Sequence, residues 1–248
     1  MIQSRLRGMG VALITPFKED GSVDYDALLR LVDYQLQNNT DFLCVLGTTA
    51  ETPTLSDEEK KQVKKLVIER VNGRIPILLG VGGNCTQAVV DTLKNDDFTG
   101  VDAILSVVPY YNKPSQEGIY QHYKAIAEAT DLPIVLYNVP GRTGCTLMPA
   151  TVASLAKDVD NIIGIKDATG NMHMTMQMMQ LCQGDIDLYS GNDEIIVPVL
   201  SAGGKGVISV LSNVVPKETH DICAKFFEGD VKGSLDLQLK YLPLIDNL

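Results

Sequence analysis

Eight short apolar runs, separated by stretches with helical spacing, limit what this chain can fold into more than any other feature of its sequence. Each run has the length of a strand, is rich in branched residues and is almost uninterrupted, which is typical of strands covered on both faces. The runs are residues 11–15, 42–46, 75–81, 103–108, 133–137, 162–165, 186–189 and 207–210. Between them, apolar residues recur three and four positions apart, as at Leu28, Leu31 and Val32. The sequence therefore predicts that strands and helices alternate.

This alternation predicts an α/β fold with a parallel sheet. Eight units at a spacing of roughly 25 to 35 residues favour a closed (β/α)8 TIM barrel, although the number of units alone also fits an open doubly wound sheet. The 248 residues suit one domain, so we expect residues 1–248 to form a single barrel. Active sites of such barrels lie at the C-terminal ends of the strands and in the loops that follow.

The composition argues against several classes of protein. The formal net charge is −10 and acidic residues are spread along the chain, so we expect no nucleic-acid partner and no anionic membrane partner. No apolar run approaches the length of a membrane span, and residues 1–16 lack the pattern of a signal peptide, which together predict a cytoplasmic location. Five scattered cysteines without a C-x-x-C pair indicate reduced thiols.

Cofactor signatures are missing from the sequence. The three histidines lie far apart, and no pair has the spacing of a metal site on one helix. The glycine-rich segments 80–83 and 203–206 match neither a P-loop nor a dinucleotide fingerprint. We therefore expect no metal and no cofactor, and a protein that acts on small molecules.

Lys166 directly follows the run 162–165 and is expected inside the mouth of the barrel. Partial desolvation of an amine there favours its neutral form, which lowers its pKa and leaves a nucleophile that can attack a keto group. Imine formation with a small keto acid is therefore one hypothesis. The alternative is an ordinary ion pair with Asp167 or another acid.

Two further strand ends carry suitable side chains. Tyr137 ends the run 133–137, where a phenol can relay protons beside an imine or can simply plug the core. Arg142 lies in the loop 141–144, where its guanidinium can grip a carboxylate or remain solvated.

Hydroxyl groups and aromatic rings follow two other runs. Thr48 and Thr49 come after the second run, in a turn of small residues whose hydroxyls and backbone N–H groups can seat a carboxylate. Tyr110 and Tyr111 come after the fourth, and adjacent residues there tend to point in different directions. Both rings fit a site or an interface between subunits.

Five segments, in order along nearly the whole chain, resemble one enzyme family. They are Gly-Thr-Thr-Ala-Glu at 47–51, Pro-Tyr-Tyr-Asn-Lys-Pro at 109–114, Tyr-Asn-Val-Pro-Gly-Arg-Thr-Gly at 137–144, Gly-Ile-Lys-Asp-Ala-Thr-Gly-Asn at 164–171 and Gly-Val-Ile-Ser-Val at 206–210. Together they resemble the dihydrodipicolinate synthase (4-hydroxy-tetrahydrodipicolinate synthase) family, among the pyruvate-dependent class I aldolases of the N-acetylneuraminate lyase superfamily. The resemblance implies a TIM-barrel lyase that condenses pyruvate with L-aspartate-4-semialdehyde in the diaminopimelate route to lysine.

The resemblance implies catalytic roles for four residues. Lys166 would carry the pyruvate imine. The proton relay would consist of Tyr137, Thr48 and Tyr111. Tyr111 would reach into the site of a neighbouring subunit, as in the tight dimer of the family, so the resemblance implies a dimer or a dimer of dimers (a homotetramer).

The resemblance also implies how the substrates are held. Thr49 and Ile208 would line the pyruvate site, and Gly191 would lie beside it. Arg142 would hold the carboxylate of the semialdehyde.

Many members of the family are inhibited by lysine at the dimer interface. The resemblance places that pocket at Pro53, Asn84 and Tyr110. Ala88 stands where lysine-sensitive members carry a glutamate, and Lys60 adds a positive charge near the pocket. We therefore expect inhibition by lysine to be weak or missing.

The sequence departs from the family pattern at two places, and two other functions remain possible alternatives. Ala50 stands where the family usually has glycine, and the chain ends at Leu248, where family members continue into a C-terminal helical appendage. We therefore expect a barrel that is truncated at its C-terminus and largely lacks this appendage. The other functions are a sister lyase, of the N-acetylneuraminate lyase or keto-deoxy-sugar aldolase type, and a metabolite-binding barrel without turnover.

Overall fold

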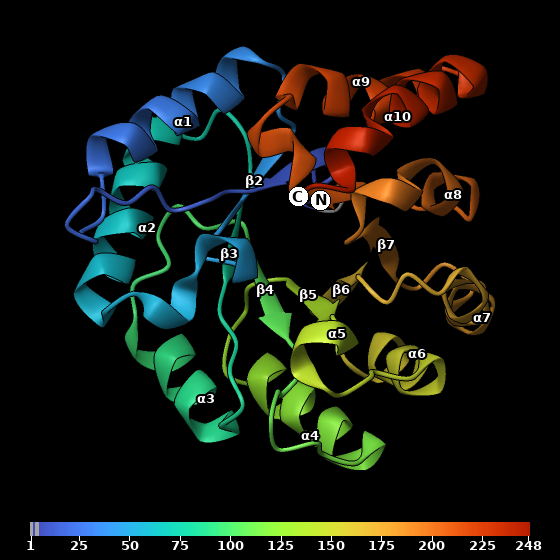
Figure 1. Ribbon diagram of the computed structural model, residues 1–248. Coiled ribbons are helices and arrows are strands. Elements are labelled where there is room, and N and C mark those ends of the chain that lie inside the picture. The colour runs from blue at the N-terminus through green and yellow to red at the C-terminus, as the bar shows by residue number, and fades with distance from the viewer. Residues whose placement is uncertain (1, 3–4) are drawn as a thin grey trace.

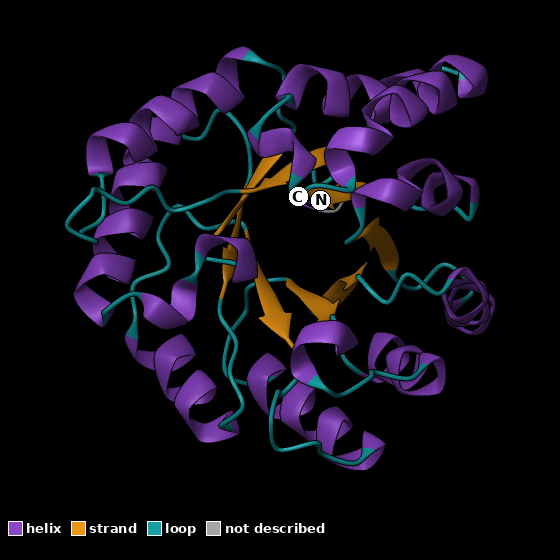
Figure 2. Cartoon of the chain, viewed as in Figure 1, coloured by secondary structure: helices purple, strands orange, loops and turns teal. Residues whose placement is uncertain are grey.

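Eight parallel strands pair in the order of the sequence, and the last pairs with the first to close a barrel (Figures 1 and 2). The structure is a computed structural model that describes Ile2 and residues 5–248. The strands are β1 (Gly8–Ala12), β2 (Phe42–Val45), β3 (Ile77–Gly80), β4 (Ala103–Val107), β5 (Ile134–Asn138), β6 (Ile162–Asp167), β7 (Asp187–Ser190) and β8 (Gly206–Ser209). The predicted (β/α)8 TIM barrel is confirmed.

A ring of helices surrounds the strands, with the helix pairs of neighbouring units side by side (Figure 1). The helices are α1 (Tyr25–Gln37), α2 (Asp57–Val71), α3 (Thr86–Asn95), α4 (Gln116–Ala127), α6 (Pro149–Asp158), α7 (Met172–Cys182), α8 (Ile196–Ser201), α9 (Pro216–Phe227) and α10 (Val231–Ile245). The loops after the strands carry the short helix α5 (Pro140–Thr143) and the 3-10 turns η2 (Thr48–Ala50), η3 (Thr52–Thr54), η4 (Asp193–Ile195) and η5 (Leu211–Asn213).

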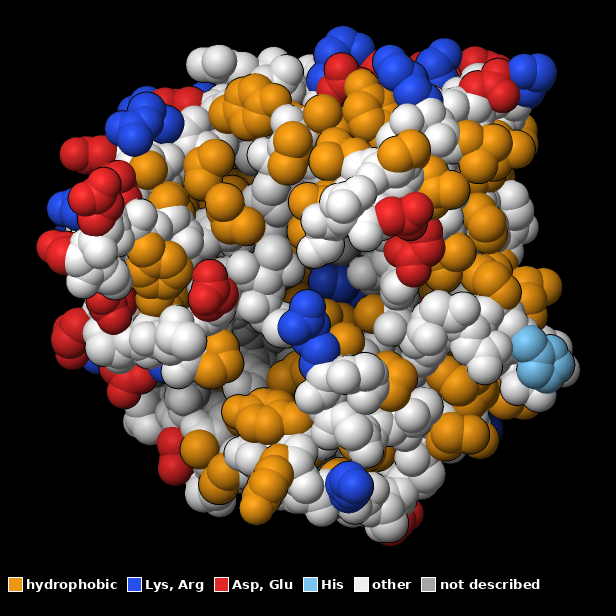
Figure 3. All heavy atoms as spheres, viewed as in Figure 1, with side chains coloured by type: hydrophobic (Ala, Val, Ile, Leu, Met, Phe, Trp, Pro, Cys, Tyr) orange, Lys and Arg blue, Asp and Glu red, His pale blue; other side chains and the backbone are white. Residues whose placement is uncertain are grey.

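The apolar side chains form two layers, as expected for strands covered on both faces. One layer lies between the strands and the helices, and Val11, Val32 and Ile104 belong to it. The other fills the interior of the barrel, and Phe42, Leu105 and Tyr189 belong to it. The barrel interior is therefore packed and is not a pore. The space-filling view shows a hollow at the centre of the face seen in Figure 3.

The structure corrects the position of the first strand, which begins at Gly8, before the predicted run 11–15. The seam between β1 and β8 brings two backbones very close together: a Cβ atom on Gly206 would lie 1.8 Å from the carbonyl oxygen of Gly8. A Cβ atom on Gly10 would lie 2.1 Å from the ring of Phe42. The start of β1 therefore needs glycine where the other strands have branched residues, and a search for apolar runs overlooks it.

Helix starts follow the local chemistry of the sequence. Ser56 and Glu59 form a capping box at the start of α2, in which each side chain satisfies an N–H of the other residue. Pro149 is the first residue of α6, where its fixed φ suits the helix and no N–H is lost. Both helices therefore begin where the local sequence favours a helix start.

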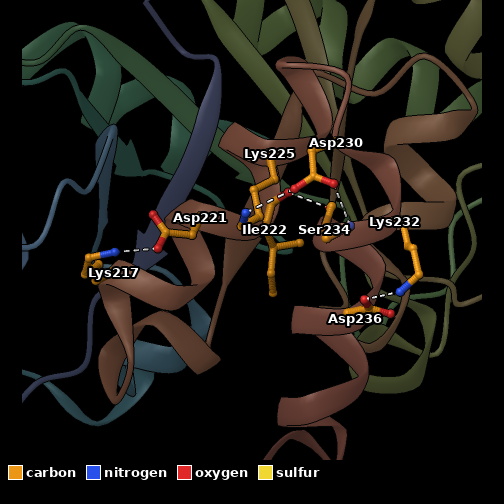
Figure 4. Close-up of polar contacts among 9 residues, drawn as sticks. Lys217, Asp221, Ile222, Lys225, Asp230, Lys232, Ser234 and Asp236 are labelled. Atoms are coloured by element: carbon orange, nitrogen blue, oxygen red, sulfur yellow. Dashed lines mark hydrogen bonds and ion pairs between the residues drawn. The ribbon is translucent and has the colours of Figure 1, made fainter.

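The last two helices pack against each other and brace the barrel (Figure 4). The hydroxyl of Ser234 on α10 donates to the carbonyl of Ile222 on α9 at 2.6 Å, and Lys225 pairs with Asp230 across the turn at 3.1 Å. One turn further along α10, Gln238 donates to the carbonyl of Glu194 at 2.6 Å. Helix α10 therefore holds the turn that follows β7.

A buried histidine makes the fold sensitive to acid. The ring of His122 on α4 is 4% exposed, and its Nδ1 lies 2.8 Å from the hydroxyl of Thr86. Burial lowers the pKa of His122 from 6.5 to about 4. Because the folded state resists protonation that the unfolded chain accepts, the stability contributed by the neutral ring is complete above pH 6.5 and is lost as the pH falls toward 4.

We therefore expect His122→Gln, which stays neutral at every pH, to remove part of the acid sensitivity. The loss of unfolding free energy between pH 7 and pH 4.5 should be smaller in this variant than in the wild type, by on the order of 2 kcal/mol. Urea unfolding at both pH values measures it, with the exposed His173→Gln as the control. An unchanged acid loss in His122→Gln would contradict this role.

Candidate active site

A cavity of ≈ 350 Å³ lies at the C-terminal ends of the strands, where the sequence predicts the site. Its walls come from the ends of β3, β4 and β5 and from the segments after β2, β3, β4 and β5. Three of the predicted catalytic and substrate-binding residues line it, namely Thr48, Tyr137 and Arg142. Basic side chains are visible within the central hollow of Figure 3.

Lys166 lies on β6 and is buried, with 4% of its surface exposed. Its Nζ atom is 4.5 Å from the centre of the Tyr137 ring, because β5 and β6 pair these two residues in register. Lys166 is not itself a lining residue of the cavity, but Tyr137 is. The predicted burial of this amine next to the phenol is confirmed.

The ion pair that the sequence left open, between Lys166 and Asp167, is not formed in the described part of the chain. Asp167 accepts hydrogen bonds from the Thr175 hydroxyl at 2.7 Å and from the Thr169 amide at 3.2 Å. The carboxylate thus ties the start of α7 to the end of β6. The amine of Lys166 remains available for chemistry.

Helix α5 brings Arg142 to the rim of the cavity. The helix has Pro140 at its first position and Gly144 in the left-handed conformation at its end, so one turn forms and then stops. Thr143 fastens the turn, because its hydroxyl donates to the Cys145 carbonyl at 2.8 Å. The side chain of Arg142 is exposed, which suits capture of a substrate carboxylate at the entrance.

The turn after β2 presents Thr48 to the cavity, whereas Thr49 is half-buried and does not line it. The turn is tight: Leu46 and Glu51 both adopt the left-handed conformation, with φ of 56° and 54°. Ala50 lies between them with its side chain buried, and its carbonyl accepts from the Thr15 hydroxyl at 2.8 Å. The turn therefore accommodates alanine at this position.

The two adjacent tyrosines diverge, as the sequence predicts. Tyr110 lines the cavity, whereas Tyr111 is 86% exposed and does not line it. Tyr111 has a φ of 71°, a conformation that non-glycine residues rarely adopt. The surrounding chain holds this strained residue with its ring directed into solvent, so Tyr111 is not brought together with the other site residues within one chain.

Ile208 and Gly191 do not line this cavity. Ile208 is fully buried and packs in the barrel interior with Tyr137. The amide of Gly191 donates to the Asp167 carbonyl at 2.7 Å, and a Cβ atom there would lie 2.6 Å from the Cβ atom of Ala168. Glycine is therefore required for the chain after β7 to approach the end of β6.

A second cavity, of ≈ 450 Å³, shares Tyr110 and Lys60 with the first. Asn84 and Ala88 also line it, but Pro53 lines the first cavity instead. Other lining residues are Asp57, Lys61 and Lys64. Asp57 pairs with Lys60 at 3.2 Å, so its carboxylate already has a cationic partner.

Two buried groups near Lys166 were missed from the sequence. The thiol of Cys44 has its pKa raised to about 11 by burial, against the opposing charge of Lys166. Asp193 is 7% exposed, and its Oδ2 atom accepts from the amides of Val210 and Leu211 at 2.9 Å each. Asp193 follows β7 and so lies in one of the segments where a barrel site is expected. Nothing in the local sequence shows that this carboxylate is buried.

The described residues (Ile2 and 5–248) contain no group of three His, Cys, Asp or Glu side chains placed to hold a metal ion. None of their helices is long and apolar enough to cross a membrane.

Comparison with known proteins assigns the family. Residues 5–248 match the model of the dihydrodipicolinate synthetase family. The chain belongs to this family. It is 63% identical over 248 residues to a 4-hydroxy-tetrahydrodipicolinate synthase of Phocaeicola vulgatus, covering 100% of this chain and 84% of that protein. The family is enzymatic and acts on small molecules, which confirms the resemblance seen in the sequence.

Solved structures of the family share the whole barrel. The dihydrodipicolinate synthase of Acinetobacter baumannii, described as chloride inhibited and complexed with pyruvate, is 43% identical, has a TM-score of 0.94 and aligns over 97% of this chain and 82% of its own. The enzyme of Cyanidioschyzon merolae with lysine bound is 36% identical, has a TM-score of 0.93 and aligns over 98% of this chain and 83% of its own.

Proposed function

We propose that this chain is a 4-hydroxy-tetrahydrodipicolinate synthase, which condenses pyruvate with L-aspartate-4-semialdehyde in the diaminopimelate route to lysine. The observation that carries the proposal is the amine of Lys166, buried at the catalytic end of the barrel against Tyr137. Relatives of the same name, up to 63% identical along the full chain, support the choice of substrates.

The first half of the reaction forms the imine. The neutral amine of Lys166 attacks the keto carbon of pyruvate, and the resulting carbinolamine loses water as the C–N double bond forms. Tyr137 supplies a proton to the departing hydroxyl, since its phenol lies beside the amine. Loss of a proton from the pyruvate methyl group then gives an enamine.

In the second half, the enamine carbon attacks the aldehyde carbon of the semialdehyde, and the new alkoxide takes up a proton. Arg142, exposed at the rim, holds the carboxylate of this substrate. Thr48 passes protons between Tyr137 and the solvent side of the cavity, which all three residues line. Attack of the substrate's amino group on the imine carbon closes the product ring and releases Lys166.

The remaining residues complete the site. Thr49, Gly191 and Ile208 surround the carboxylate end of pyruvate at the barrel end. Tyr111 serves the site of a neighbouring subunit, which explains why a strained residue presents its ring to solvent in the single chain. The proposed assembly is therefore a dimer or a dimer of dimers, located in the cytoplasm, where its free thiols stay reduced.

Replacing Lys166 with arginine should abolish trapping of pyruvate by borohydride. A guanidinium stays protonated and cannot attack the keto group. Mass spectrometry of the treated protein measures the adduct, and the exposed Lys205→Arg serves as the matched control. Undiminished trapping in Lys166→Arg would remove this residue from its proposed role, and trapping without turnover in the wild type would favour the metabolite-binding alternative.

We expect Tyr137→Phe to bind pyruvate but to turn over at least about a hundredfold more slowly, because a positioned acid–base group contributes that much. Steady-state kinetics with both substrates provide the measurement. Tyr120→Phe, which removes a phenol bonded to Asp158 on the outer helices, is the control. A kcat near the wild-type value in Tyr137→Phe would leave the phenol with a packing role only.

Lysine should inhibit only at millimolar concentrations or above. Three lysines (Lys60, Lys61 and Lys64) and two carboxylates (Asp57 and Asp96) line the second cavity, Asp57 is paired with Lys60, and Ala88 carries no charge, so the lining favours the two ammonium groups of lysine poorly. Activity is titrated with L-lysine at saturating pyruvate. Ala88→Glu should increase the sensitivity; half-inhibition well below millimolar in the wild type would show that the pocket works without that carboxylate.

A further inference from the structure

The seam between β7 and β8 is the weakest backbone connection at the catalytic end of the barrel. The two strands share only two register pairs, which end at Ser190 and Val207, whereas β5 and β6 share five. Strand β8 continues to Ser209, and the chain then enters η5. The amides of Val210 and Leu211 therefore lie beyond the reach of the β7 backbone.

A side chain makes the hydrogen bonds that backbone pairing between β7 and β8 does not provide here. The Oδ2 atom of Asp193 accepts from the amides of Val210 and Leu211 at 2.9 Å each. One carboxylate thus joins the turn after β7 to the turn after β8. Because Ile208 precedes this junction on β8, the same contact fixes the wall of the site that Ile208 forms.

The second oxygen of the same carboxylate is buried and makes no hydrogen bond of normal geometry in the described part of the chain, although the Ser209 hydroxyl lies near the carboxylate. Burial raises the pKa of Asp193, and the Ser209 hydroxyl, the two amides and the charge of Lys166 oppose that rise. The titratable groups that face Asp193 are Lys166 on β6 and the buried thiol of Cys223 on α9. Lys166 is the only cation among these groups, and it acts on Asp193 through its charge and not through an ion-pair contact.

We propose that Asp193 is a positioning residue for the reaction on Lys166: it fastens β8 to β7 at the catalytic end, and its unpartnered oxygen provides the negative charge that favours the iminium cation. The proposal rests on the proposed function of Lys166. An iminium nitrogen carries a positive charge in a place where only 4% of the lysine is exposed, and a buried cation is unstable without a fixed opposite charge.

The test compares Asp193→Asn with Glu194→Gln by the rate of borohydride trapping of pyruvate from pH 6 to pH 9. Asparagine keeps an acceptor for both amides but removes the charge, whereas Glu194 is an exposed acid in the same turn. We expect Asp193→Asn to trap pyruvate at least about tenfold more slowly than the wild type. Its pH profile of trapping should change, and its unfolding temperature should not. Glu194→Gln should match the wild type.

Each outcome has a separate meaning. Trapping by Asp193→Asn within twofold of the wild type at every pH overturns the proposal and leaves the function of Lys166 intact. A purely structural Asp193 would lower the unfolding temperature without changing the pH profile of the folded protein. No trapping in the wild type overturns the proposed function and this proposal with it.

A second variant covers the case in which Asp193→Asn fails to fold. Asp193→Glu keeps the charge but lengthens the side chain by one methylene group, which displaces the carboxylate. We expect it to keep the pH profile of trapping and to lower kcat, because the seam and Ile208 shift together. Wild-type kcat and wild-type trapping in a folded Asp193→Glu would overturn the positioning role.

Discussion

Closure of the barrel between β1 and β8 is the constraint on which the rest of the structure depends. Only when the ring is closed do the ends of all eight strands converge on one face, and only then do segments far apart in the sequence form one cavity. Glycine at position 206 permits this closure, since a side chain there would collide with the backbone of Gly8 on the opposing strand. Ordering the site residues costs conformational entropy, and the packing of the closed barrel offsets this cost.

The closed end of the barrel concentrates charge in a buried place. Lys166 and Asp193 are both nearly inaccessible to solvent, Lys166 on β6 and Asp193 in the turn after the neighbouring strand β7. The charge of Lys166 also lowers the pKa of the buried thiol of Cys44, against the larger effect of burial. A low-dielectric setting strengthens each of these interactions, so a small number of groups can govern reactivity. Arg142, by contrast, lies at the exposed rim. This division suits a reaction in which one substrate is bound covalently at depth and a second arrives at the entrance.

The two cavities share a wall, which has consequences for control of the enzyme. Tyr110 and Lys60 line both, so a ligand in the outer cavity would touch residues that also border the inner one. Tyr110 is followed directly by the strained Tyr111. A shift of this segment would therefore act on the inner cavity and on the ring proposed to serve a neighbouring subunit at the same time.

The sequence by itself determined the alternation of eight strands with helices, which favoured a barrel over an open sheet, and it determined that Lys166, Tyr137, Thr48 and Arg142 lie at strand ends or in the segments that follow them. It misplaced β1, because glycines needed for a close approach leave no apolar signal. Only the tertiary structure decided which strand ends meet: it placed Tyr137 against Lys166, directed Tyr111 away from the cavity and buried Asp193 under β8. The reason is physical, since burial and charge proximity depend on strand register and on side chains that come from distant parts of the chain.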